Sequence, residues 1–169
     1  MRSLPVLLPA AIVLARGCPL ASIRQIRTWR LSLVERDPAE AGVPRPAGWG
    51  DGLDVEARPR SDEPHHDRVT GAVRWSTTVT GDGFRAHWEA PSAVRGPVRV
   101  RGDLVVDPLD GRPTTGRILR VRVVTEMRAI GEDGVERVVA LRGRDRTAIP
   151  TSLDPEDRGV LLDLELNVA

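Results

Sequence analysis

The fold is decided by the stretch Val73–Glu89, which reads VRWSTTVTGDGFRAHWE. Apolar and polar residues alternate on both sides of Asp82–Gly83, a dipeptide typical of two-residue hairpin turns because both of its positions tolerate positive φ. Such a turn pairs Val79 with Ala86 and keeps the apolar residues of both strands on one face. The pattern and the turn agree on one register, so the stretch predicts an antiparallel β-hairpin.

The same period-2 alternation recurs outside this hairpin, and helical periodicity is scarce. One apolar and one polar face per strand is typical of antiparallel sheets with one face on the core. About seven short strands separated by turns predict an all-β fold, either a small antiparallel barrel resembling an OB-fold or a sandwich. The alternating runs lie at Trp29–Leu33, Val98–Asp107, Leu119–Arg128 and Val160–Val168. The residues expected in the core include Trp75, Trp88, Val100, Val121, Val123, Leu162 and Leu164.

Residues 1–21 are expected to form a leader outside the core. Leu4–Ala15 is an apolar run of twelve residues, shorter than the ~20 residues needed to span a membrane. It has the length of a signal-peptide core, so export is one reading of it. A disordered leader and an extension from a start site placed too early are the other two. We expect a cytoplasmic location over export, and no membrane span.

Residues 22–169 are expected to form one β domain, because 169 residues is a one-domain length. Residues 37–68 are rich in Pro, Gly and acidic residues and show no sustained period, which predicts a long irregular insertion. Within it, Leu53–Ala57 could form a short edge strand, and we expect Trp49 to pack against the core.

Composition restricts the classes of function. All 25 basic residues are arginine, a bias typical of a very GC-rich genome rather than of nucleic-acid binding. The net charge of +1 supplies no strong field to attract a polyanion. The absence of lysine excludes a P-loop, and the single cysteine excludes an intramolecular disulfide.

Three strand-like segments carry a resemblance to known sequences. They are GPVRVRGDLVVD (Gly96–Asp107), GRILRVRVVTE (Gly116–Glu126) and GVLLDLEL (Gly159–Leu166). They resemble short uncharacterised β-strand-rich proteins of GC-rich actinobacteria. The resemblance covers the second half of the chain and implies no function and no site residue.

No catalytic motif is evident, which favours a non-enzymatic role without deciding against an enzyme, and no cofactor is expected. His65–His66 lies among the acidic residues Asp62, Glu63 and Asp67, and His87 could supply a further ligand. Adjacent histidines rarely converge on one ion, so a solvated acidic loop is the favoured interpretation and no metal site is predicted.

One arginine cluster is the candidate site. If strands Pro97–Asp107 and Gly116–Arg128 formed a hairpin, residues whose numbers sum to 221 would be paired. Four arginines would then share the polar face, Arg101 opposite Arg120 and Arg99 opposite Arg122. Facing like charges repel, and an anion in the patch would relieve that repulsion.

Two structural alternatives to this anion site stay open. A nearby carboxylate such as Asp103, Glu126 or Glu89 could neutralise the arginines, or Pro108 and Pro113 could shift the register. In either case the arginines would be ordinary surface charge.

The sequence therefore favours a non-enzymatic interaction or ligand-binding β-barrel module, whose partner would be an anionic ligand or an acidic protein. The first alternative is binding of nucleic acid or another polyanion through the arginine-rich sheet face. The second is an enzyme whose residues are scattered in ways that one sequence cannot show.

Overall fold

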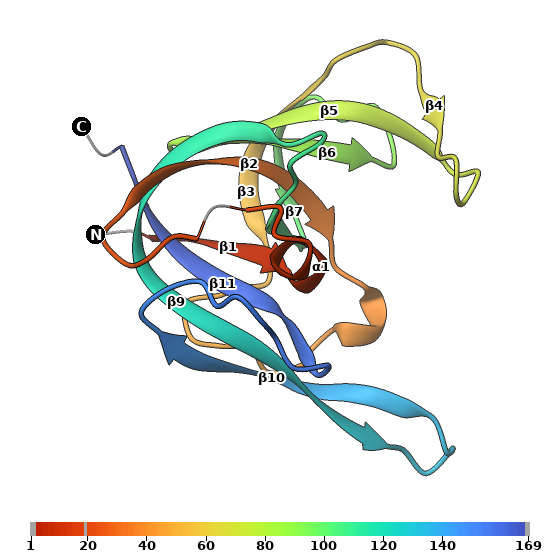
Figure 1. Cartoon of the computed structure of the whole chain (residues 1–169). Helices are drawn as coiled ribbons and strands as arrows, with labels where there is room; N and C mark the ends of the chain where they lie inside the picture. The colour runs from red at the N-terminus through yellow and green to blue at the C-terminus, as the bar shows by residue number, and fades with distance from the viewer. Residues whose placement is uncertain (1–2, 19, 168–169) are drawn as a thin grey trace. The chain divides into compact units, whose positions relative to one another are not determined.

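The computed structural model describes residues 3–18 and 20–167 (Figure 1). Strands account for 57% of the chain and helices for 5%, and the strands include a closed five-stranded β-barrel with further strands outside it. The prediction of an all-β barrel is therefore confirmed. No helix in the described ranges is long and apolar enough to cross a membrane.

The described residues form eleven strands, more than the seven or so expected from the sequence. The strands are β1 (Ser3–Pro9), β2 (Ile26–Glu35), β3 (Leu53–Pro59), β4 (His65–His66), β5 (Val73–Gly81), β6 (Phe84–Ala90), β7 (Gly96–Val100), β8 (Gly102–Val106), β9 (Arg112–Ile130), β10 (Glu136–Arg146) and β11 (Asp157–Leu166). The helical elements are α1 (Ala10–Leu14) and the 3-10 helix η1 (Pro38–Glu40).

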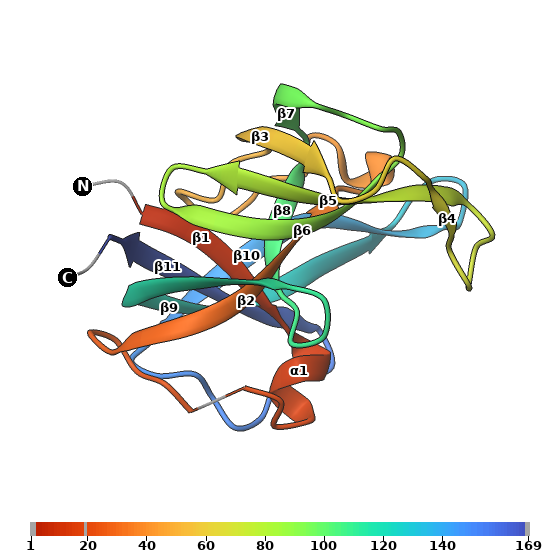
Figure 2. The same cartoon turned by 90° about the horizontal axis from the view of Figure 1, so that it is seen from above.

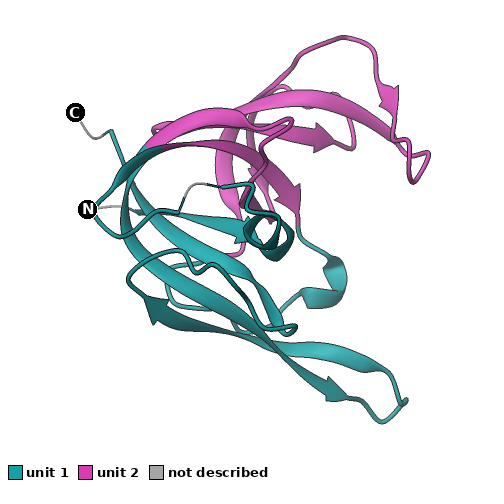
Figure 3. Ribbon diagram, viewed as in Figure 1, with its two compact units in different colours: residues 1–27, 36–50, 116–169 teal, residues 28–35, 51–115 magenta. Residues whose placement is uncertain are grey.

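The chain divides into two compact units (Figure 3). Unit 1 comprises Met1–Arg27, Arg36–Gly50 and Gly116–Ala169, and unit 2 comprises Thr28–Glu35 and Asp51–Thr115. Within unit 1 the strands are ordered β10-β9-β11-β1, and within unit 2 they are ordered β8-β2-β6-β5-β3-β7, with β4 beside β5. These units share no boundary with the expected division into a leader at 1–21, a domain at 22–169 and an insertion at 37–68.

The segment predicted to be a leader is a core strand of unit 1. β1 pairs antiparallel with β11, from Ser3 opposite Glu165 to Pro9 opposite Gly159, and the two strands lie side by side in both views (Figure 1 and Figure 2). Val6 is fully buried. The prediction of a non-core leader is wrong, because a short apolar run ended by a proline also suits a strand buried on both faces.

The hairpin of β5 and β6 in unit 2 has the predicted register. Val79 lies opposite Ala86 and Thr77 opposite Trp88, and all four side chains are buried. Six of the seven expected core residues are likewise buried. Trp75, near the start of β5, is only partly buried.

The segment 37–68 is more regular than expected. β3 lies between β5 and β7, so it is not an edge strand. Trp49 is buried, as predicted, and the Arg45 guanidinium lies 3.6 Å from the centre of its ring. This segment is held in place by residues that are distant from it in the sequence. Local periodicity does not predict such partners.

Candidate functional site

The hairpin that would have gathered four arginines does not form. β7 pairs with β3 and β8 with β2, whereas β9 pairs with both β10 and β11. The predicted register summing to 221 is wrong. The connecting turn does exist, since the Asp107 carbonyl accepts from the Gly111 amide at 3.1 Å. The flanking strands nevertheless take other partners: β11, whose residues Val160, Leu161 and Leu162 are all fully buried, pairs with β9.

Each of the four arginines faces a carboxylate within its own unit. In unit 2, Arg99 lies 3.0 Å from Asp54 and 3.7 Å from Asp51, and Arg101 lies 3.9 Å from Asp51. In unit 1, Arg120 binds Asp145 through two hydrogen bonds of 2.6 and 3.0 Å. Arg122 lies 2.9 Å from Asp163. The repulsion that would have called for an anion is therefore absent.

Arg122 is the most buried member of this set, with 3% of its side chain exposed. Its Nη2 donates to both carboxylate oxygens of Asp163, and its Nη1 donates to the Ala47 carbonyl at 2.7 Å. It thereby ties β9 to β11 and to the loop after η1. Its outer nitrogens are thus occupied by protein groups, which gives Arg122 a structural role in unit 1.

The histidines of unit 2 surround one carboxylate. Nε2 of His65 lies 2.9 Å from one oxygen of Glu89, and Nε2 of His87 lies 2.6 Å from the other. Each of these two rings therefore contacts a different oxygen of the Glu89 carboxylate. In the described part of the chain, no three or more His, Cys, Asp or Glu residues are grouped so that they could hold a metal ion. The geometry suits a hydrogen-bonded cluster that ties β4 to β6.

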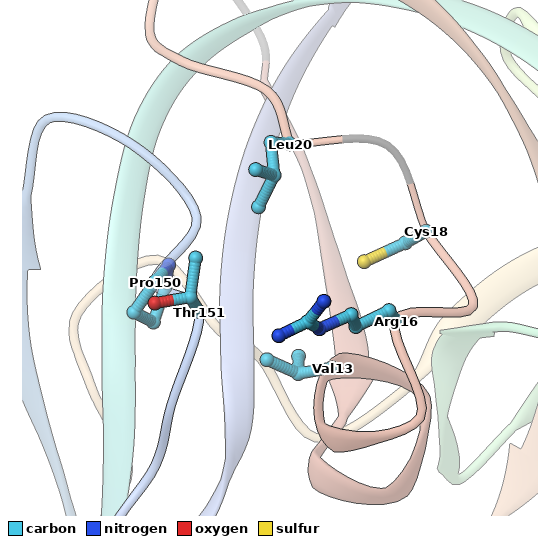
Figure 4. A pocket seen from close by; sticks show the side chains of 6 residues that line it. All are labelled: Val13, Arg16, Cys18, Leu20, Pro150 and Thr151. Atoms are coloured by element: carbon cyan, nitrogen blue, oxygen red, sulfur yellow. The ribbon is translucent and has the colours of Figure 1, made fainter.

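A pocket of about 390 Å³ lies in unit 1 beside the end of α1 (Figure 4). Its described lining residues are Val13, Arg16, Cys18, Leu20, Pro150 and Thr151. The volume is near the lower end of the roughly 300–1,000 Å³ typical of small-molecule sites. A small molecule therefore fits this pocket better than a macromolecular segment does.

Backbone contacts hold the two walls of the pocket together. Ser22 and Ala148 form an isolated β-bridge, and the Ile149 amide donates to the Ala21 carbonyl at 2.8 Å. Ile149 is buried, and this places Pro150 and its neighbour at the rim. The pocket is therefore built on two tethered segments that are distant in sequence.

The end of α1 determines where the Arg16 side chain lies. The Arg16 amide donates to the Val13 carbonyl at 3.1 Å, and the Gly17 amide donates to the Ile12 carbonyl at 2.9 Å. This pair of bonds is a Schellman motif, whose left-handed residue is usually glycine. Here that residue is Arg16, with φ of 53°. The turn directs the guanidinium across the pocket toward Thr151 (Figure 4).

The Arg16 guanidinium has no protein partner among the described residues. No described carboxylate, carbonyl or hydroxyl accepts a hydrogen bond from it, and no described acid forms an ion pair with it. The carbonyls of Ile12 and Val13 already accept backbone amides. Among the described residues, nothing occupies these charged donors, so they can bind a ligand.

The remaining lining groups are neutral. Burial raises the pKa of the Cys18 thiol above its ordinary value, so Cys18 is protonated at neutral pH and is a poor nucleophile. Thr151 contributes a hydroxyl, whereas Val13, Leu20 and Pro150 contribute aliphatic surface. The described lining residues therefore combine one charged group with a hydroxyl, a protonated thiol and aliphatic surface.

Sequence reasoning missed this pocket because residues 1–21 were set apart from the fold. One local signal was available in the sequence. Arg16 ends an apolar helical run and directly precedes Gly17, although the first residue after a helix is usually the glycine itself. The opposite wall, Pro150–Thr151, lies in an irregular stretch without any motif, and only the bridge at Ala148 brings it close.

Comparisons with protein families, curated proteins and solved structures found no match for this chain. The resemblance to short actinobacterial proteins therefore stays a prediction.

Proposed function

We propose that this protein is a non-enzymatic ligand-binding module whose site is the pocket beside α1. The observation that carries the proposal is the Arg16 guanidinium, which reaches into a mostly aliphatic pocket of about 390 Å³ without a described protein partner. Ligand pockets commonly combine apolar walls with a few polar groups that fix orientation. An anionic ligand would supply the partner that Arg16 lacks.

The two alternative functions have less support. A polyanion on the sheet face would have to displace carboxylates from Arg99, Arg101, Arg120 and Arg122, all of which already face one. An enzyme would need an activated nucleophile or a tuned acid and base, and the thiol in the pocket has its pKa raised rather than lowered.

The test uses Cys18, the only cysteine in the chain, as a reporter inside the pocket. The rate of its alkylation by iodoacetamide is measured at pH 8.5 with and without a set of small neutral and anionic compounds. A compound that occupies the pocket should slow alkylation, and ligand-observed NMR should detect its binding.

Two variants make this test specific. Thr151→Trp should fill the rim of the pocket and abolish binding, whereas Ser152→Trp places the same ring on an exposed neighbour that does not line the pocket and should leave binding intact. If no compound protects Cys18, or if both variants bind equally, the pocket is not a ligand site.

A further inference from the structure

We infer that the pocket selects a monocarboxylate with an aliphatic body, and that Arg16 is the residue that determines this selectivity. The inference rests on the proposed ligand-binding function and specifies the ligand. Four features of the site support it: the type of charge, the amount of charge, the shape of the walls and the backbone of Arg16 itself.

The type of charge favours a carboxylate. A guanidinium presents parallel N–H donors that match the two oxygens of a carboxylate, and such forked pairs are among the stronger hydrogen bonds in proteins. In Figure 4 the guanidinium points toward the middle of the labelled side chains that line the pocket, and Arg16 is exposed to solvent. The described lining residues include no acid that could neutralise it.

The amount of charge favours a monoanion. Arg16 is the only charged group among the described lining residues, and Thr151 adds one hydroxyl. A phosphate monoester carries up to two negative charges and three acceptor oxygens, which would need further donors. One forked cation with one hydroxyl matches a single carboxylate.

The walls favour an aliphatic body. Val13, Leu20 and Pro150 are all aliphatic, and no described lining residue is aromatic. The pocket therefore offers contact with methyl and methylene groups but no stacking surface for a flat ring.

The fourth feature is the left-handed backbone of Arg16. A residue with a Cβ atom is strained at φ of 53°, and glycine would relieve that strain at this position of a Schellman motif. Backbone strain of this kind clusters at ligand sites, where the side chain has a role that glycine cannot fill. Arg24 provides a comparison, because it is also an arginine at positive φ, 71°, but does not line the pocket.

The experiment compares 3-methylbutanoate with its neutral isostere 3-methylbutanamide and with inorganic phosphate, by titration calorimetry and by protection of Cys18 from alkylation. The full chain is used as wild type and as the variants Arg16→Gly, Arg16→Gln and Arg24→Gly. We expect the wild type to bind the acid at least tenfold more tightly than the amide or phosphate.

The variants separate binding from folding. Arg16→Gly and Arg16→Gln should each weaken binding of the acid by about ten- to a hundredfold, the value of a hydrogen-bonded charge. Arg24→Gly removes the same charge and the same kind of strain elsewhere, so it should bind like the wild type. Melting temperatures should be unchanged or raised in both glycine variants, so a loss of binding in Arg16→Gly would not come from unfolding.

The outcomes distinguish this inference from the proposed function. If the amide binds as tightly as the acid, or if Arg16→Gln binds the acid like the wild type, the pocket is a ligand site but carboxylate selectivity is wrong. Tighter binding of phosphate would contradict the monocarboxylate assignment. If none of these probes and none of the compounds in the Cys18 screen binds, the proposed function itself fails.

Discussion

The β5–β6 hairpin of unit 2 and the β1–β11 ladder of unit 1 are both antiparallel, yet only the first could be derived from the sequence. The hairpin joins residues close in the chain, and its Asp82–Gly83 turn admits a register that keeps the apolar side chains together. The ladder joins Ser3 to Glu165 with no turn between them. Local turn chemistry specifies a register, whereas a ladder between chain ends depends on which strands bury each other.

The largest effect should come from removing one strand of the ladder. Deleting residues 3–9 removes β1, leaves the edge of β11 that it pairs with unpaired and removes buried side chains such as Val6, so we expect loss of cooperative unfolding by calorimetry. Leu14→Ser, an exposed position in the adjoining helix, is the control and should change stability little. Cooperative unfolding of the deletion at the wild-type temperature would mean that this segment does not belong to the core.

The hairpin can be tested by replacing single side chains instead of removing a whole strand. Trp88→Ala should lower the free energy of unfolding by about 3–5 kcal/mol, because the ring is 4% exposed. Trp75→Ala, on the facing strand but only partly buried, should cost clearly less. Equal costs, measured by denaturant unfolding, would show that burial does not distinguish the two rings.

The buried ion pair tests what holds β9 to β11. Arg122→Met leaves Asp163 buried without its partner, so we expect a loss of about 3–5 kcal/mol in denaturant unfolding. The double variant Arg122→Met with Asp163→Leu removes both charges and should recover most of that loss. If the double variant is less stable than the single one, the pair contributes net stability and this account is wrong.

The pH dependence of unfolding can be compared between the two units, because each contains a carboxylate whose pKa is lowered in the folded state. Burial raises the pKa of Asp157 in unit 1, but hydrogen bonds from the Thr125 hydroxyl and the Asp154 amide outweigh it, so the pKa lies below its ordinary value. Burial likewise raises the pKa of Asp107 in unit 2, and the Ser32 hydroxyl with backbone amides lowers it further than burial raises it.

A carboxylate with a depressed folded-state pKa stabilises the fold above its unfolded pKa of about 3.9, and that stability is lost as the pH falls through the folded pKa. Asp157→Asn and Asp107→Asn should therefore each cost about 1–3 kcal/mol at pH 7 and converge on the wild type as the pH falls through the lowered folded-state pKa. Asp82→Asn, in the exposed hairpin turn, should follow the wild type throughout. Costs that do not change with pH would contradict the proposed role of these charges.

The two candidate sites repeat the contrast between the hairpin and the ladder. The predicted cluster of four arginines assumed that the strands on either side of the turn at Asp107–Gly111 pair with each other. The turn exists, but those strands pair with other strands. The pocket was missed because its walls, at Arg16 and Thr151, come from segments that only the Ser22–Ala148 bridge brings close. Neither error could be corrected from periodicity, which reports the burial of a face and not the identity of its partner.

The sequence by itself determined the all-β class, the position and register of the β5–β6 hairpin and most of the core, because alternation and turn residues act over a few neighbouring positions. The tertiary structure alone decided that β1 is a core strand, that each predicted site arginine meets a carboxylate, and that Arg16 lines a pocket. Those outcomes depend on pairing between distant residues. Many strands have one apolar face, and only packing selects which of them bury each other.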